Sequence, residues 1–348
     1  MKILTPSICP ETPVQLADAL HGLAAGGRTI RLGGNFSKDR LGGCVPRAGV
    51  TVSTCAMKRL LKYEPRDLTI SVEAGMPWAE LERTLAEHRQ TLPLDPPWTN
   101  ESTVGGVVAA NLSGPRRRLY GTARDMIIGM TFATLAGKLV TSGGMVVKNV
   151  AGLDMAKLMI GSFGTLAAIA VVNFKVFPVP AASRTFVMQF ATRAKAFAER
   201  DRILRSVLQP AAIDLVNWPS GFRLLVRAVG NEAVLQRYVR ELRGASIVTG
   251  EEESDLWESV REFTPRFLEE HPWGGVAAMS TSLTEMLAVA EKLNVPFIAR
   301  AGSGVLYAHY ASDPPKVSIR GDSAMMTRVK EMFDPERLLN PGRLYGYI

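Results

Sequence analysis

Glycine-rich clusters at three separated places in the first half of the chain constrain its fold more than any other feature. They cover residues 33–37, residues 103–114, and residues 148–152 together with 161–165. Glycine lets the main chain approach a ligand closely and adopt unusual φ angles, and successive backbone N–H groups can then form a concavity that binds an anion. Each cluster alone is also typical of an ordinary tight turn or helix–loop contact. Only their combination indicates a site for a nucleotide.

The common fingerprints of nucleotide sites are absent from all three clusters. No Gly-x-Gly-x-x-Gly follows a strand within a βαβ unit, and no Walker pattern ends in Gly-Lys-Ser or Gly-Lys-Thr. These absences disfavour a Rossmann NAD site and a P-loop ATPase. The three cysteines, Cys9, Cys44 and Cys55, form no Cys-x-x-Cys pair. We therefore expect no iron–sulfur cluster, no zinc site and no other metal in this chain.

Apolar periodicity predicts mixed helices and strands up to a domain boundary near Pro178. Thr12 is predicted to cap the first helix, with Pro13 at the first helical position. The predicted elements are a helix over 12–26, strands over 29–32 and 68–72, a helix over 77–87, a β-hairpin of 126–135 and 138–141, a short helix over 154–160 and a core strand over 163–177.

In the second half of the chain, strands and helices are predicted in the order β-α-β-β-α-β, which is typical of a ferredoxin-like unit. Its elements are a strand over 185–190, a helix over 194–208, strands over 212–216 and 222–229, a helix over 232–242 and a strand over 246–249. Helices over about 255–269 and 283–293, strands over 295–299 and 304–309 and a tail helix over 325–333 follow.

Six segments, in their order along the chain, resemble the FAD-binding oxidoreductases of the vanillyl-alcohol oxidase type. They are residues 31–37, 68–75, 103–115, 121–125, 148–164 and 334–343. Within that family the chain is most similar to the FAD-binding subunits of bacterial glycolate oxidases, in residues 112–117, 124–125 and 147–152. The resemblance is dense over residues 12–180, thins through 181–330 and returns at 334–343.

The resemblance implies an α+β fold with two domains. A two-lobed FAD-binding domain of the PCMH type would cover residues 1–180, and a ferredoxin-like α/β cap domain, facing substrate or a partner, would cover 181–330. The C-terminal segment, residues 331–348, would return to the FAD-binding domain.

The resemblance also implies where the cofactor lies. Gly33, Gly34, Asn35, Phe36 and Ser37 would face the FAD diphosphate; Thr103, Val104, Gly105, Gly106, Asn111, Ser113 and Gly114 would line the path of the flavin and ribityl chain; Lys148, Asn149 and Gly152 would sit beside the cofactor; and Asn340 and Arg343 would close on the flavin. Alternatives that stay open are a surface lysine at 148 and plain turn chemistry at Asn340.

Two positions depart from the family pattern. Family members that attach FAD covalently often carry a histidine in the first glycine loop, where this chain has Asn35-Phe36. We therefore expect FAD to be bound non-covalently. Leu153 replaces the tyrosine that usually follows the Ala-Gly pair, which puts one contact to the cofactor or a neighbour in doubt.

Oxidation of a 2-hydroxy acid needs a cation for the carboxylate and a base for the hydroxyl proton, while the flavin accepts the hydride. Arg300 is the candidate clamp for the carboxylate, and His309, in a predicted strand, is the candidate base. A purely structural role for either residue stays open. We expect His21 and His88, which lie in amphipathic helices, to be structural or exposed.

The formal net charge of +8 fits an acidic partner or an anionic substrate. The basic run at residues 116–118 is too short for a nucleic-acid tail, so nucleic-acid binding is disfavoured. The start of the chain lacks the pattern of a signal peptide, and no apolar run is long enough to span a bilayer. The expected location is therefore the cytoplasm, with at most peripheral contact with the inner face of the membrane.

Three functions remain open on the sequence. By resemblance, the chain would be a subunit of a glycolate oxidase complex that oxidises glycolate to glyoxylate, with a second flavin subunit and an iron–sulfur subunit as partners. It could instead be a self-sufficient FAD-dependent dehydrogenase of another hydroxy acid or alcohol. A third alternative is a flavin-binding assembly subunit with no turnover of its own.

Overall fold

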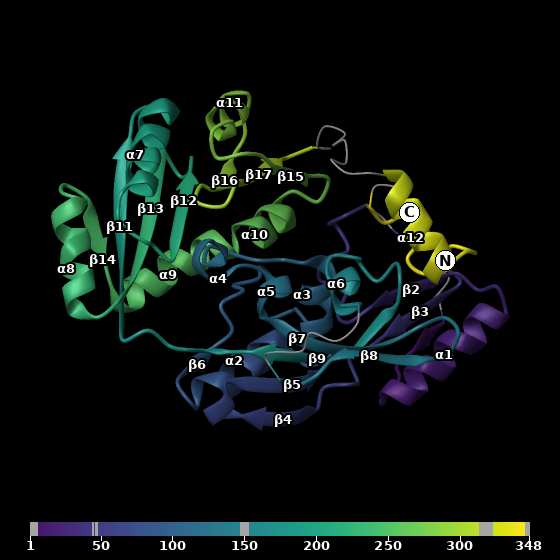
Figure 1. Ribbon diagram of the computed structural model, residues 1–348. Helices are drawn as coiled ribbons and strands as arrows, with labels where there is room; N and C mark the ends of the chain where they lie inside the picture. Colours follow the sequence, from purple (N-terminus) through teal and green to yellow (C-terminus); the bar gives the residue numbers. More distant parts are fainter. Residues whose placement is uncertain (1–5, 44, 46–47, 147–152, 313–322, 345–348) are drawn as a thin grey trace.

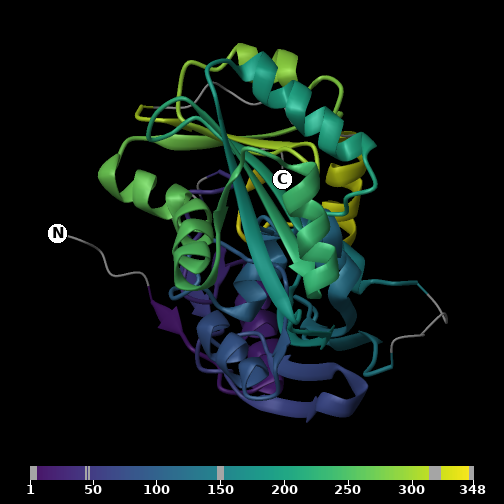
Figure 2. The ribbon, with the colours of Figure 1, turned by 90° about the vertical axis from the view of Figure 1, so that its left-hand side faces the viewer.

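The computed structural model describes residues 6–43, 45, 48–146, 153–312 and 323–344 of the chain. Helices and strands are mixed throughout these residues, as the sequence predicts. The strands up to residue 178 form a three-stranded, a five-stranded and a two-stranded sheet, and those from 182 to 310 form one seven-stranded sheet. Figures 1 and 2 show the seven-stranded sheet lying above the smaller sheets in both views.

The first lobe is a parallel sheet of three short strands, β1 (Ser7–Ile8), β3 (Val50–Ser53) and β2 (Ile30–Gly33), in that order. Helix α1 (Pro13–Ala25) packs on it through Leu16 and Leu20, which are fully buried. Thr12 caps this helix by accepting a hydrogen bond from the Gln15 N–H, and Pro13 is its first residue. The predicted start of the helix is therefore confirmed.

The second lobe is an antiparallel sheet of five strands in the order β4-β5-β9-β7-β8. The strands are β4 (Leu60–Glu64), β5 (Thr69–Glu73), β9 (Ala168–Lys175), β7 (Ile127–Ala133) and β8 (Leu139–Gly143), and β6 (Gln90–Thr91) pairs separately with β10 (Phe177–Pro178). Helices α2 (Trp78–Ala86) and α3 (Val104–Ala110) share a core with this sheet. Shorter helices are η1 (Pro65–Asp67), α4 (Arg117–Tyr120), α5 (Ala123–Met126) and α6 (Ala156–Met159).

Two predictions for this lobe have different outcomes. The β-hairpin is confirmed, because β7 and β8 pair in antiparallel register around the turn at Gly137. The core strand, however, begins at Ala168 rather than at Phe163. Phe163 and Gly164 both have positive φ angles, of 53° and 68°, and this left-handed backbone cannot continue a strand.

The seven-stranded sheet has the order β14-β11-β13-β12-β16-β17-β15. Its elements are β11 (Ala182–Phe190), α7 (Arg193–Arg205), β12 (Ala212–Val216), β13 (Phe222–Gly230), α8 (Glu232–Glu241), β14 (Ser246–Val248), α9 (Gly250–Arg261), α10 (Phe263–Glu270), β15 (Gly275–Ser280), α11 (Met286–Glu291), β16 (Phe297–Arg300) and β17 (Val305–Tyr310). The first four strands in space have the order of a ferredoxin-like unit, which confirms that prediction. The sheet continues beyond it because β16 pairs with β12.

The helix predicted over 255–269 is two helices, since α9 ends at Arg261 and α10 starts at Phe263. Helix α9 packs on one face of the sheet through Trp257 and Val260, next to Leu225. Helices α7 and α8 pack on the opposite face, next to Leu224 and Val226. The alternation of these three consecutive β13 residues places the helices on two sides.

The end of the chain returns to the first lobe after α12 (Ser323–Phe333). The Ile30 N–H donates to the Leu338 carbonyl at 2.7 Å, and the Asn340 N–H donates to the Ile30 carbonyl at 2.9 Å. Val329 and Phe333 of α12 pack against the core of the second lobe. Among the residues that the structure describes, no helix combines the length and apolar character needed to cross a bilayer.

A buried ion pair stabilises the C-terminal segment where it packs against the first lobe. Lys330 and Asp334 both have fully buried side chains, and Lys330 Nζ donates to Asp334 Oδ2 at 2.5 Å. The same ammonium donates to the carbonyls of Thr165 and Leu339. Burial lowers the pKa of Lys330, and Asp334 counteracts this by favouring the charged form.

We predict that Asp334→Ala lowers the free energy of unfolding by about 3–5 kcal/mol, because it leaves the Lys330 ammonium buried without its partner. Asp154→Ala is the control, since it removes the exposed Asp154–Lys157 pair and should cost less than about 1 kcal/mol. Chemical denaturation of both variants measures the difference. Equal losses would contradict the role given to the buried pair.

Candidate functional site

Two adjoining cavities contain most of the residues that the sequence singled out. The glycine cavity, of about 90 Å³, lies between the loop after β2, helix α3 and the turn at Phe163. The arginine cavity, of about 730 Å³, lies between the end of α3 and strands β15, β16 and β17. Ala110 and Phe163 line both cavities, so an elongated ligand can extend from one into the other.

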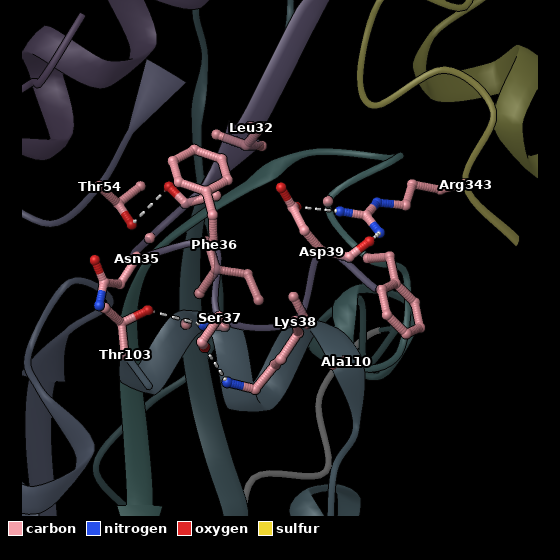
Figure 3. A pocket seen from close by; sticks show the side chains of 18 of the residues that line it. Leu32, Asn35, Phe36, Ser37, Lys38, Asp39, Thr54, Thr103, Ala110 and Arg343 are labelled. Atoms are coloured by element: carbon pink, nitrogen blue, oxygen red, sulfur yellow. Dashed lines mark hydrogen bonds and ion pairs between the residues drawn. The ribbon is translucent and has the colours of Figure 1, made fainter. Parts of the chain in front are cut away.

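Five of the 19 residues that line the glycine cavity are glycines. Its lining residues are Leu32, Gly33, Gly34, Asn35, Phe36, Ser37, Lys38, Asp39, Thr54, Thr103, Gly105, Gly106, Ala109, Ala110, Phe163, Gly164, Ala167, Ile169 and Arg343. Figure 3 shows Asn35, Ser37 and Thr103 on one side of this cavity and Asp39 with Arg343 on the other. These side chains come from segments about 300 residues apart.

At two positions of this cavity, neighbouring segments pack so closely that only glycine fits. A Cβ at Gly34 would lie 2.1 Å from Thr103 Oγ1, and a Cβ at Gly105 would lie 2.8 Å from the Ala74 Cβ. These glycines therefore let the β2 loop, helix α3 and the segment after β5 meet. Gly106 differs, because an added Cβ there would meet only Thr103 Oγ1, at 3.2 Å. Since Gly106 also lines the cavity, its free side is open to a ligand.

The Asn340 side chain supports the wall of the glycine cavity from the side that faces away from the cavity. Its Nδ2 donates to the carbonyls of Leu32, at 2.9 Å, and Phe163, at 2.7 Å, while its Oδ1 accepts from the Leu32 N–H at 2.7 Å. The side chain is only 1 % exposed and does not line either cavity. Gly164 lies against it, where a Cβ would be 2.9 Å from Asn340 Nδ2.

The charged side chains of the glycine cavity form two groups. Arg343 donates to Asp39 Oδ1 at 2.7 Å and to three loop carbonyls, and Arg31 also pairs with Asp39. Lys38, by contrast, is 8 % exposed and donates to the hydroxyls of Ser37 and Ser102. Burial lowers the pKa of Lys38 to about 7.

All the charged side chains among the described residues that line the arginine cavity are arginines. They are Arg117, Arg261 and Arg300. Arg300 is 5 % exposed and forms a buried ion pair with Asp214, but its Nε has no partner. Burial raises the pKa of Asp214, and the Arg300 guanidinium opposes this rise. The cavity therefore suits an anionic ligand.

His309 lies behind the wall of the arginine cavity rather than on its surface. It is fully buried, and its Nε2 lies 2.8 Å from the Thr264 hydroxyl. The rings of Phe263 and Phe267 contact the imidazole edge-on, at 4.8 and 5.3 Å between ring centroids. Burial lowers the pKa of His309 to about 4, so the imidazole is neutral at pH 7 and has no direct path to the cavity.

The predicted site residues fall into four groups. Gly33, Gly34, Asn35, Phe36, Ser37, Thr103, Gly105, Gly106 and Arg343 line the glycine cavity. Asn111, Ser113 and Arg300 line the arginine cavity. Val104, Gly114, Asn340 and His309 line neither and are packed into the protein. Lys148, Asn149 and Gly152 lie outside the described residues.

Lys38, Asp39, Arg117 and Phe163 are among the cavity-wall residues that sequence reasoning missed. Lys38 and Asp39 follow the first glycine loop, Arg117 follows the second cluster, and Phe163 lies within the third. The position of Lys38 directly after Ser37 was an available signal. Phe163 was assigned to the core strand instead, because its positive φ angle has no signature in the sequence.

These features fit FAD. The open side of Gly106 leaves space next to backbone, and the buried Lys38 ammonium supplies a positive charge for a diphosphate. The adjoining arginine cavity has room for a flat ring system. Among the described residues, no group of His, Cys, Asp and Glu side chains could hold a metal ion.

Comparisons with known proteins agree with this cofactor. Residues 7–143 match the family model described as an FAD binding domain. Glycolate oxidase subunit GlcE of Escherichia coli is 31% identical, over 90% of this chain and 91% of that protein. The mitochondrial cytochrome D-lactate dehydrogenase of Arabidopsis thaliana is 25% identical, over 86% of this chain and 66% of that protein.

The fold also matches a solved structure. Alkyldihydroxyacetonephosphate synthase superposes with a TM-score of 0.71, over 96% of this chain and 75% of that one. The sequence identity is 19%, so this likeness bears on the fold alone. The PCMH-type architecture expected from the sequence is confirmed.

We predict that Gly106→Leu weakens FAD binding by about 10-fold or more, because the new side chain fills space at the cavity wall. Gly22→Leu is the matched control, since Gly22 also lies within a helix and has open space around its Cβ position. Calorimetric titration of the flavin-free proteins measures both affinities. A Gly106→Leu protein that binds FAD as tightly as the control would show that the ligand does not reach this wall.

Proposed function

Because the chain belongs to the family of FAD-binding oxidoreductases that includes glycolate oxidase subunit GlcE, we propose that it is the FAD-binding subunit of a complex that oxidises glycolate to glyoxylate. Bound FAD, held non-covalently, supplies the acceptor for the hydride of the substrate. Residues of the glycine cavity would hold the diphosphate, and residues of the arginine cavity would hold the flavin ring. The similarity to GlcE over nearly the full length of both proteins supports this assignment.

The observation that carries the proposal is that every charged side chain lining the arginine cavity, within the part of the chain that the structure describes, is an arginine. Glycolate is a carboxylate, and arginine binds carboxylates through two parallel hydrogen bonds. Arg117, Arg261 and Arg300 line the cavity. Arg261 also pairs with Glu262 and Arg300 with Asp214, whereas Arg117 has no ion-pair partner among the described residues. In this proposal the arginines fix the substrate carboxylate next to the flavin ring.

The lining of the arginine cavity suggests why this chain would work within a complex. No His, Asp or Glu is among the described residues that line the arginine cavity. In this proposal a partner subunit that docks at the cavity supplies the base for the substrate hydroxyl. We propose a second flavin subunit and an iron–sulfur subunit as partners. The formal net charge of +8 favours an acidic docking surface on one of them.

Anaerobic mixing of the purified, FAD-loaded chain with glycolate tests this proposal. We expect the flavin absorbance to persist with the chain alone and to bleach when the chain is part of its co-purified complex. Rapid bleaching with the chain alone would instead identify a self-sufficient dehydrogenase. Bleaching in the complete complex that accounts only for the flavin of the second subunit, with every hydroxy acid tried, would identify this chain as a flavin-binding assembly subunit.

We predict that Arg117→Met raises the KM for glycolate in the complex by about 10-fold or more, because it removes a charged donor for the carboxylate. Arg124→Met is the control, since Arg124 is exposed and does not line the cavity. Steady-state kinetics and the FAD content of both variants are measured together. An unchanged KM at full FAD content would contradict substrate binding at this wall.

A further inference from the structure

Lys38 is a buried cation in the wall of the glycine cavity. It lies in the loop after β2 and is 8 % exposed. Its Nζ donates to Ser37 Oγ at 3.0 Å and to the Ser102 hydroxyl. Figure 3 shows the side chain of Lys38 reaching beneath Ser37, with a dashed line joining the two. Two hydroxyl groups are therefore its hydrogen-bond partners within the protein.

No carboxylate within the described part of the chain is close enough to form an ion pair with Lys38. The neighbouring Asp39 is engaged by Arg31 and Arg343 instead. Glu101 acts on Lys38 only as a more distant charge. Burying a charge without a partner of opposite sign costs free energy of folding. An anionic ligand would therefore stabilise the Lys38 ammonium, which has no such partner among the described residues.

Glu262 is the other carboxylate near Lys38, and both of its oxygens accept hydrogen bonds from backbone N–H groups. Its Oε2 accepts from the Trp98 N–H at 2.9 Å, and its Oε1 accepts from the Thr99 N–H at 3.2 Å. Glu262 acts on Lys38 at a distance, in the direction that favours the charged form. It does not replace a direct partner.

We propose that Lys38 is a cofactor-binding residue whose ammonium pairs with the diphosphate of FAD. This assignment rests on the proposed binding of the diphosphate in the glycine cavity. The cavity walls favour the diphosphate over the flavin ring, because Lys38 lines the glycine cavity and does not line the larger arginine cavity. A phosphate oxygen next to Lys38 would replace the missing carboxylate and form a charge-assisted hydrogen bond.

Proton uptake follows from this pairing. In the flavin-free protein, burial lowers the pKa of Lys38 to about 7, while Glu101 and Glu262 partly oppose this shift. A bound diphosphate stabilises the ammonium and raises the pKa again. Above pH 7 the flavin-free protein has lost the proton that the complex retains. FAD affinity therefore falls as pH rises above about 7, by up to about 10-fold per pH unit.

The test compares Lys38→Met with the parent chain and with Lys58→Met, which removes an exposed lysine. FAD affinity is measured by calorimetry from pH 6 to pH 9. At pH 6 we expect Lys38→Met to bind FAD about 10- to 100-fold more weakly than the parent. Its affinity should be independent of pH, while the parent and Lys58→Met lose affinity above pH 7.

Thermal melting and redox titration separate this role from others. Lys38→Met removes an uncompensated buried charge, so the flavin-free variant should melt at or above the temperature of the parent. A lower melting temperature with unchanged FAD affinity would overturn the proposal in favour of a structural lysine. A shifted flavin potential with unchanged FAD affinity would overturn it by placing Lys38 at the ring. If the parent itself bound no FAD, the proposed function would fail as well.

Discussion

The geometry of the two adjoining cavities depends on the side-chain amide of Asn340. This one group bonds to both backbone atoms of Leu32, at the start of the first glycine loop, and to the carbonyl of Phe163, where the two cavities adjoin. It is buried and saturated, so its bonds act in a region with little competing water. The left-handed backbone at Phe163 and Gly164 persists only because such contacts determine it. The buried Lys330 ammonium anchors the segment that delivers Asn340 to this place.

A second set of polar contacts fixes the seven-stranded sheet above the two lobes. Glu262, between α9 and α10, accepts hydrogen bonds from two backbone N–H groups of the loop at Trp98. Arg40, from the first lobe, donates to the carbonyls of His271, at 2.9 Å, and Gly274, at 2.5 Å. The boundary between the lobes and the sheet is therefore held by charged and polar groups, whereas the cores on each side are apolar.

The sequence predicts the strands and helices best where their periodicity is strong. The ferredoxin-like unit and the β7–β8 hairpin follow from alternation and turn residues, and both are present. Strand β15 was not predicted, because its sequence, Gly-Val-Ala-Ala-Met-Ser, lacks alternation and bulky β-branched residues. The break at Glu262 was missed because apolar residues continue on both sides of it.

The sequence identifies cavity-wall residues best where a glycine allows close backbone approach, as at Gly34 and Gly106. The position of Lys38 after Ser37 was a signal in the sequence, but its significance depends on its burial and on the lack of an anionic partner among the described residues. The central claim is that the adjoining cavities hold one FAD. Titration of the flavin-free chain with FAD, followed by tryptophan fluorescence and melting temperature, tests it most directly. The account predicts saturation at one FAD per chain, quenching of Trp98 at the arginine cavity, and a higher melting temperature. Fluorescence and melting temperature that stay unchanged at excess FAD would contradict it.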